Sequence, residues 1–463
     1  MIFKTELYEH QQEAVDKLIR LKVGALLMEM GTGKTRTALE IESRRLDAGK
    51  IEHVIWLCPC SCKLNLKKDI EKHCGYMPDW ITIMGIETMS TAINQIFEMI
   101  ELSQTMRCAL IVDESSKIKN PAALRTRHIQ EIAKACEYKM ILNGTLISRN
   151  EADIFSQFFL LDWRILGYRS YNSFCANHVR FDERCPDKIR DCINVDYLAE
   201  KIEPYSYQKM KSECLDLPEK TYKNHYFDLT QEMYDHYNDV LEFLLPYVDD
   251  SIQETIYRLF SCCQAVVAGN RVLFKVNKKD ELEGRELVPF YENPADNPRI
   301  KALQAVLSEI PDKAIIYCKY TKEINDISEV LDAEYGAGST TKYYGEMGER
   351  KKNESIERFE GPARFLIANK QCAGYGLNLQ FCSYVIFYDN DFDFGTSVQA
   401  EDRVHRIGQQ NNVHIINMVA LGTIDDLILG CQGRKENLSE SFKSCLTALR
   451  EQYGKEIHQQ ECV

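Results

Sequence analysis

The chain has 463 residues, which is more than one compact domain usually contains, so two or three domains are expected. Hydrophobic residues make up 44% of it and charged residues 27%, a globular composition that excludes wholesale disorder and collagen-like or coiled-coil architecture. The 57 basic and 70 acidic residues give a net charge of −13, which argues against a protein whose main task is to coat nucleic acid.

Hydropathy and cysteine usage indicate the compartment. No apolar run approaches the ~18 residues of a membrane helix, and the polar start is unlike a signal peptide. Eighteen cysteines are too sparse for a disulfide scaffold, and Cys58, Cys60 and Cys62 are expected to be strand-end thiols rather than zinc ligands. We therefore expect no membrane partner, no structural metal and a reducing cytoplasm, in a bacterial or phage-infected cell, or a nuclear location in a eukaryote.

Short apolar runs alternate with amphipathic helical stretches over the first 160 residues. A buried strand is predicted over residues 24–28, followed by a helix from Lys34 to about Leu46. Further short apolar runs predict strands at residues 54–57, 81–84, 109–112 and 140–142. This alternation is typical of an α/β lobe with a parallel sheet.

The rhythm is interrupted and then returns in the second half of the chain. Residues 161–215 and 231–267 show mainly helical patterns, and residues 293–298 read as a connector. Strands are predicted again at residues 314–317, 365–368, 384–388 and 413–416. The predicted division is lobe 1 over 1–222, with a helical protrusion at about 161–215, and lobe 2 over 223–463, with a helical protrusion at about 231–290 and a C-terminal helix at about 424–463.

A glycine-rich turn lies between the first predicted strand and the first helix. Its residues are Met30, Gly31, Thr32, Gly33, Lys34, Thr35 and Arg36. Glycines let backbone N–H groups curl round phosphate oxygens, and the helix start adds its dipole. The lysine can reach the β- and γ-phosphates and the second threonine can ligate magnesium. Met28 stands where the full pattern has Gly or Ala, so the match is partial. A glycine turn with an incidental lysine is the alternative, which the strand–turn–helix order disfavours.

Asp113 and Glu114 follow the predicted strand at 109–112. In a phosphate-binding lobe the first of these carboxylates can hold magnesium, and the second can orient and deprotonate the attacking water. A strand-ending acidic turn of no chemical role is the alternative when such a pair stands alone. Together with Lys34 in an α/β lobe, the pair predicts ATP hydrolysis.

The second lobe has no phosphate loop of its own but carries a basic motif at residues 399–409. Arg403 and Arg406 are three residues apart and are expected on one face of a helix. Guanidinium groups stabilise charge on a transferring phosphoryl group, so the nucleotide of the first lobe is their expected target. A charged, solvated helix surface is the alternative.

Residues 399–409 closely resemble the sixth motif of Swi/Snf-type DNA translocases of helicase superfamily two, and the resemblance extends over nearly the whole chain. The other matching stretches are 7–11, 31–35, 59–65 with 69–70, 113–120, 142–145 with 150, 217–220, 316–320, 345 with 350 and 359, 373–379, and 423–426 with 434–435. The resemblance implies two RecA-like lobes and DNA-stimulated ATP hydrolysis, by a motor that tracks along duplex DNA without separating its strands.

The resemblance also implies site residues. Nucleotide contacts fall on Gln11, Gly374 and Gln399 in addition to the glycine-rich turn. Nucleic-acid contacts are placed at four residues, Lys63, Thr88, Lys319 and Lys370. No segment is long enough for a targeting module, so a monomeric, motor-only member is expected, and any recruiting partner is unknown.

Departures from the family pattern concern the coupling of hydrolysis to movement. Ser116 stands where the family usually has His, and Asn143 and Leu146 replace the usual Thr and Pro of the third motif. Residues 391–394 replace the usual Trp-Asn-Pro. Two other functions stay open: a strand-separating DNA or RNA helicase, and a nucleic-acid-binding subunit with weak ATPase.

Overall fold

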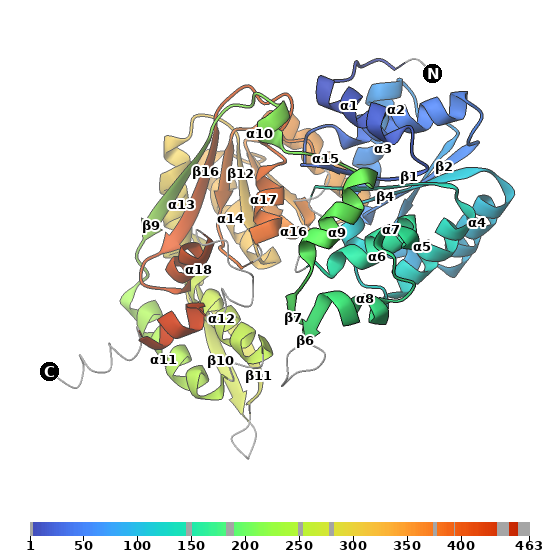
Figure 1. Cartoon of the computed structure of the whole chain (residues 1–463). Coiled ribbons are helices and arrows are strands. Elements are labelled where there is room, and N and C mark those ends of the chain that lie inside the picture. The colour runs from blue at the N-terminus through green and yellow to red at the C-terminus, as the bar shows by residue number, and fades with distance from the viewer. Residues whose placement is uncertain are drawn as a thin grey trace. The chain divides into compact units, whose positions relative to one another are not determined.

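The computed structural model describes residues 3–144, 151–181, 189–248, 253–276, 282–373, 377–392, 394–432 and 444–451. The chain divides into two compact units (Figure 1). The first is Met1–Leu217 with Tyr375–Asn378, and the second is Pro218–Gly374 with Leu379–Val463. Each unit is built around a six-stranded sheet whose paired strands all run parallel. The predicted α/β class with two RecA-like lobes is thereby confirmed.

The sheet of the first unit has the strand order β3-β2-β4-β5-β1-β8. Its strands are β1 Val23–Met28, β2 His53–Cys58, β3 Ile81–Gly85, β4 Cys108–Asp113, β5 Tyr138–Asn143 and β8 Ser206–Lys209. The predicted strands of this unit are all present. Strand β8 was not predicted, because its four residues are mostly polar and lie at the sheet edge, where no apolar run is required.

Alternate side chains of these strands enter two separate cores. In β4, Leu110 and Val112 pack on one face of the sheet, and Ala109 and Ile111 on the other. The helices of the first core are α4 Ile93–Thr105, α5 Leu124–Ala135 and α6 Asp153–Leu161. Those of the second are α1 Glu9–Leu18, α2 Lys34–Asp47 and α3 Lys63–Cys74. Both faces of the sheet are therefore covered, which explains its continuous apolar strands.

The protrusion of the first unit is mainly helical. Its elements are α7 Trp163–Leu166, α8 Tyr171–His178, β6 Val179–Phe181, β7 Ile189–Cys192, α9 Val195–Ile202 and α10 Lys211–Cys214. The strands β6 and β7 form a short antiparallel hairpin that the sequence did not predict. Short 3-10 turns complete the unit at η1 Cys60–Cys62, η2 Glu87–Ser90, η3 Ser115–Ile118 and η4 Glu203–Tyr205.

The sheet of the second unit has the order β13-β14-β12-β15-β16-β9. Its strands are β9 Lys220–Phe227, β12 Ala314–Cys318, β13 Thr340–Tyr343, β14 Phe365–Asn369, β15 Tyr384–Phe387 and β16 Val413–Ala420. The four predicted strands are present, and the edge strands β9 and β13 were missed because they are mostly polar and contain no apolar run. Strand β9 runs beside β16 from Lys220↔Val413 to Phe227↔Ala420.

The remaining elements of this unit are helices and one hairpin. The helices are α11 Gln231–Leu244, α12 Gln253–Val267, α13 Pro298–Glu309, α14 Thr321–Tyr335, α15 Glu349–Glu360, α16 Lys370–Ala373, α17 Phe394–Glu401 and α18 Ile424–Gln432, with turns η5 Leu245–Tyr247 and η6 Pro294–Asp296. The predicted helical protrusion at 231–290 is wrong in its second half, because β10 Asn270–Val276 and β11 Leu282–Pro289 pair as an antiparallel hairpin.

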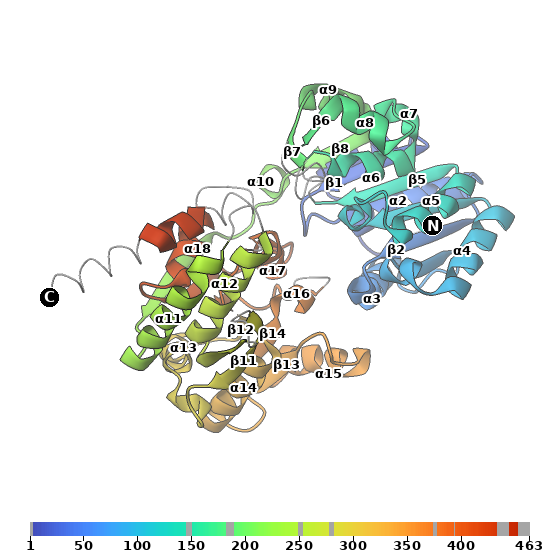
Figure 2. The same cartoon turned by 90° about the horizontal axis from the view of Figure 1, so that it is seen from below.

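Two described helical stretches fall within the predicted C-terminal helix. Helix α18 ends at Gln432, and residues 444–451 are helical again. In Figure 2, α18 lies beside α12, and the two helices are in contact. Among the helices that the structure describes, none is long and apolar enough to cross a membrane.

Candidate nucleotide site

The turn between β1 and α2 is shaped to receive an anion. Gly31 and Gly33 have φ angles of 80° and 91°, in the left-handed region that favours glycine. Gly33 is the N-cap of α2, and no side chain of the described residues caps this helix. The N–H groups of the first turn, together with the dipole of a 14-residue helix, therefore provide donors for a phosphate group.

The lysine of this turn lies along the turn itself. Lys34 Nζ donates hydrogen bonds to the carbonyl oxygens of Met28, at 2.8 Å, and Glu29, at 3.3 Å. The buried Thr32 hydroxyl donates to the same Glu29 oxygen at 2.7 Å. These bonds tie Thr32 and the Lys34 ammonium to Met28 and Glu29, the two residues that precede the glycine-rich turn.

Helix α1 braces the turn from outside. Gln11, which is buried, donates from Nε2 to the Thr32 carbonyl at 3.0 Å and accepts from the Tyr8 N–H at 3.1 Å. The imidazole Nε2 of His10 contacts the same Thr32 oxygen at 2.9 Å. A Cβ at Gly33 would lie 2.0 Å from Gln11 Nε2, so glycine is required there. Sequence reasoning missed His10, although it precedes Gln11 in the same motif.

Arg36 makes its contacts with protein groups. Its Nη2 donates to the Thr5 carbonyl at 3.1 Å, its Nη1 pairs with Glu40 at 2.8 Å, and its guanidinium lies 3.9 Å from the ring centroid of Phe3. The side chain is buried by these partners. It holds the start of the chain against α2, and its predicted nucleotide contact stays a prediction, as do those of Met30 and Thr35.

The acidic pair lies at the carboxyl end of β4. Asp113 is the last residue of the strand, and its Oδ1 accepts from the Glu114 N–H at 3.0 Å. Glu114 has a φ of 52°, an uncommon angle for a side-chain-bearing residue, which marks a sharp turn there. Only β5 separates β4 from β1, and the three strands run parallel. The acidic pair and the glycine-rich turn therefore both lie at the carboxyl ends of the strands, on the same side of the sheet.

A buried polar network joins the acidic pair to the end of β5. The Ser115 hydroxyl donates to Gln157 Oε1 at 2.6 Å, and Asn143 Nδ2 donates to both, at 3.3 and 3.5 Å. Gln157 is anchored by a bond from its Nε2 to the Asp153 carbonyl at 2.9 Å. Asn143, a departure from the family pattern, is thus tied to the residue after Glu114. Sequence reasoning missed Gln157, which lies 42 residues from Ser115.

The predicted helical placement of Arg403 and Arg406 is wrong. Helix α17 ends at Glu401, and both arginines lie in the turns that follow it. The Arg403 N–H donates to the Ala400 carbonyl at 3.2 Å and the Arg406 N–H to the Val404 carbonyl at 3.2 Å, which are the bonds of tight turns. We call residues 402–408 the arginine turn. Of the other predicted nucleotide contacts, Gln399 lies on α17 and Gly374 is outside the described residues. Leu146, a departure from the family's third motif, is also outside them.

Two family models match successive regions of the chain, and the first of these regions crosses the division between the two units. The SNF2-related domain matches residues 79–264, and the helicase conserved C-terminal domain matches residues 298–408. The chain is therefore similar to SNF2-related proteins in its first matched region and to helicases in its second.

Relatives differ widely in length. The TATA-binding protein-associated factor mot1 of Aspergillus fumigatus is 22% identical over 95% of the chain, but only 27% of that protein is covered. An uncharacterized ATP-dependent helicase, YqhH, of Bacillus subtilis is 24% identical over 93% of the chain and 78% of its own length. A solved Sulfolobus solfataricus SWI2/SNF2 ATPase core in complex with dsDNA has a TM-score of 0.43 at 20% identity, covering 96% of this chain and 94% of that one. The chain thus spans about a quarter of the length of the mot1 proteins.

The predicted nucleic-acid contacts fall into two groups. Lys63 starts α3 and Thr88 lies in η2, at the carboxyl ends of β2 and β3, where the Thr88 hydroxyl contacts Cys60 Sγ at 3.5 Å. In the second unit, Lys319 Nζ donates to the neutral amide of Gln264 at 2.7 Å. Lys370 is buried and its ammonium pairs with the Asp391 carboxylate at 2.7 Å. The charge of Lys370 is compensated, whereas the nearest hydrogen-bond acceptor of the Lys319 ammonium is uncharged.

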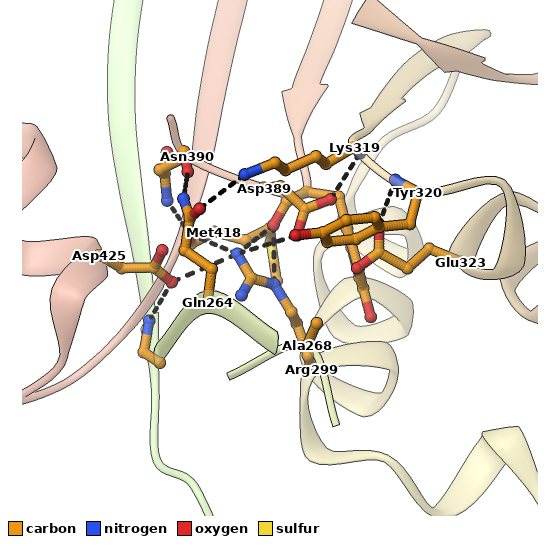
Figure 3. A network of polar contacts seen from close by, with 12 residues as sticks. Gln264, Ala268, Arg299, Lys319, Tyr320, Glu323, Asp389, Asn390, Met418 and Asp425 are labelled. Atoms are coloured by element: carbon orange, nitrogen blue, oxygen red, sulfur yellow. Dashed lines mark hydrogen bonds and ion pairs between the residues drawn. The ribbon is translucent and has the colours of Figure 1, made fainter. Parts of the chain in front are cut away.

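A buried ionic network surrounds Arg299 in the same unit (Figure 3). Its guanidinium pairs with Asp425 at 3.2 Å and approaches Asp389 at 4.0 Å, and its Nε donates to the Tyr388 carbonyl at 2.7 Å. Asp389 Oδ2 accepts in turn from the backbone N–H of Lys319 at 2.8 Å. The network therefore joins the starts of α13 and α18 to the ends of β12 and β15.

The segment after β15, which departs from the family's Trp-Asn-Pro, is held by this surrounding structure. Asn390 Nδ2 donates to the Met418 carbonyl at 2.6 Å, and the Asn390 carbonyl accepts from Gln264 Nε2 at 2.6 Å. The ring of Phe392 stacks on Phe260 of α12 with the centroids 5.0 Å apart. An aromatic pair with the protrusion helix thus fixes the chain where the family usually has tryptophan.

Proposed function

We propose that the protein hydrolyses ATP when it binds DNA and uses the energy to move along the duplex without separating its strands. The observation that carries the ATPase part is the uncapped, glycine-bounded start of α2, with Asp113 and Glu114 on the same edge of the sheet. The preference for duplex DNA rests on the family resemblance of the motifs. The single basic groove that such a motor needs is compatible with a net charge of −13.

In this proposal the residues of the first unit divide the chemistry among them. Thr35 and Asp113 present the hydroxyl and carboxylate oxygens that suit magnesium, which supplies charge neutralisation at the β- and γ-phosphates when bound. Lys34 and the α2 N–H groups bind the same phosphates, and Glu114 orients the attacking water and accepts its proton. Arg403 and Arg406 stabilise the charge that develops on the transferring phosphoryl group.

ATP hydrolysis measured with different nucleic acids tests the proposal. Duplex DNA is expected to stimulate phosphate release as strongly as single-stranded DNA or more, and RNA poorly; a bound third strand should be displaced from a triplex when ATP is present. Strong stimulation by RNA, with unwinding of a forked duplex, would assign the chain to the strand-separating helicases. No ATP turnover with any nucleic acid would leave a binding subunit.

The two lysines of the second unit are expected to contribute differently to DNA affinity. Lys319→Gln removes an ammonium whose acceptor is a neutral amide, and should lower the slope of log affinity against log salt by about one. Lys370→Gln removes a charge already paired with Asp391 and should leave the slope unchanged. Fluorescence anisotropy of a labelled duplex at several salt concentrations measures both slopes. An equal fall in the two variants contradicts this contrast.

A further inference from the structure

The first end of the segment that connects the two units is anchored to Glu29, the residue before the glycine-rich turn. The backbone N–H of Lys211, at the start of α10, donates to Glu29 Oε2 at 2.6 Å. The Glu29 N–H donates to the Lys209 carbonyl at 3.1 Å, so the same residue also contacts the last residue of β8. Glu29 is the residue whose carbonyl accepts from Lys34 and Thr32. The end of the first unit is therefore joined to Glu29, the residue that precedes the glycine-rich turn.

The other end of the connecting segment is anchored to the arginine turn. Lys220, the first residue of β9, donates from Nζ to Glu401 at 3.1 Å and to Asp402 at 3.3 Å. The Tyr222 hydroxyl donates to the same Glu401 oxygen at 2.8 Å. The imidazole of His405, within the arginine turn, donates from Nε2 to the Pro218 carbonyl at 2.8 Å. Three side chains thus hold residues 218–222 to the segment that carries Arg403 and Arg406.

These contacts are largely shielded from water. The side chains of Lys220, Glu401 and Asp402 are 20%, 8% and 12% exposed. Burial by itself lowers the pKa of Lys220, but the carboxylates of Glu401 and Asp402 outweigh it and raise the pKa, so the ammonium stays charged. Charge-assisted hydrogen bonds in such surroundings fix geometry more firmly than surface pairs do.

We propose that Lys220 is a positioning residue for the arginine turn, and that bending of the connection between the units is confined to residues 215–217. These three residues lie between the end of α10 at Cys214 and the anchored Pro218, and they belong to no helix or strand. One end of the connection is thereby bonded to Glu29, next to the glycine-rich turn, and the other end is bonded to the arginine turn. The inference rests on the proposed function, because it assigns the arginine turn a role in hydrolysis.

A purely structural role of Lys220 at the sheet edge predicts something different. Loss of an edge contact would lower the melting temperature and leave the kinetics of the folded fraction unchanged. A displaced arginine turn should lower kcat, whereas the affinity for ATP should stay the same because Lys34 and the glycine-rich turn, which bind the phosphates in the proposal, are unchanged. The split between kcat and KM therefore distinguishes positioning from stability.

The test compares Lys220→Met with Lys220→Arg and with Lys223→Met. Lys223 lies on the same strand, and its ammonium is 3.7 Å from Glu309 in an exposed pair, which makes it the matched control. With saturating DNA we expect kcat to fall at least about tenfold in Lys220→Met, with KM for ATP within about twofold of wild type. Lys220→Arg should recover most of the loss, and Lys223→Met should behave as wild type.

A second variant keeps the test open if Lys220→Met does not fold. Tyr222→Phe removes only the hydroxyl that binds Glu401, and its ring is 62% exposed, so the fold should tolerate it; kcat should fall about two- to fivefold. Wild-type kcat in folded Lys220→Met or Tyr222→Phe would overturn the inference. An inactive wild type would instead refute the proposed function itself.

Discussion

Glu114→Gln is expected to lower DNA-stimulated ATP turnover by about 10²- to 10⁴-fold. Glutamine has nearly the same shape as glutamate, so it can occupy the sharp turn after β4, but its amide cannot accept a proton from the attacking water. Asp113 and the glycine-rich turn are unchanged, and both ATP affinity and DNA affinity should stay within about twofold. Phosphate release at saturating DNA, fluorescent-nucleotide titration and duplex anisotropy measure these three quantities.

Two further variants define the origin of this effect. Lys34→Ala should also abolish turnover, but with weaker nucleotide binding, because the ammonium contacts the phosphates before hydrolysis. Glu131→Gln is the matched control: it makes the same chemical change on α5 of the same unit, in an exposed pair with Lys134. Turnover at the wild-type rate in Glu114→Gln would place the general base elsewhere.

Arg299→Met is expected to lower the free energy of unfolding of the second unit by about 3–5 kcal/mol. The guanidinium is buried and faces Asp425 and Asp389, so its removal leaves two carboxylates inside the protein without their cation. Chemical denaturation, followed with a probe in the second unit, measures the loss. Lys301→Met, on the same helix α13 but in an exposed pair with Asp296, should cost less than about 1 kcal/mol.

The pH dependence of this loss checks its cause. Burial raises the pKa of Asp425, and Arg299 opposes that rise, so the variant should have the higher Asp425 pKa. A carboxyl whose pKa is raised by folding stabilises the protein below its unfolded pKa and loses that contribution as pH rises through the folded pKa. The difference in the free energy of unfolding between wild type and Arg299→Met should therefore become smaller as pH falls from neutrality toward about pH 5. A gap of constant size would mean that packing, and not charge, is lost.

Apolar strands could be predicted from the sequence, including β3 at a sheet edge, whereas polar edge strands could not. The strands at the centre of each sheet are apolar on both faces and appear as uninterrupted hydrophobic runs. Strands β8 and β9 lie at sheet edges and are mostly polar, so they lack that pattern. The hairpin β10–β11 follows α12 directly, and its mixed composition does not mark it off from a helical continuation.

The nucleotide turn was predictable because its chemistry is contained in consecutive residues. Contacts between residues that are far apart in the sequence could not be predicted. Gln157 lies 42 positions from Ser115, and Lys220 lies 181 from Glu401, although both pairs are in direct contact. The helical placement of the arginines failed for a local reason: periodicity cannot indicate that α17 stops at Glu401, before either arginine.

The pairing of β9 with β16 has a consequence for biosynthesis. The six strands of the first sheet are all made by the time the ribosome reaches Lys209, so that unit has its whole sheet early. Strand β9 emerges next but pairs with residues made 193 positions later. Because closing so long a loop is slow, the second unit waits for nearly the entire chain. The strand that enters the second unit first is therefore left as an unpaired edge until β16 has been made.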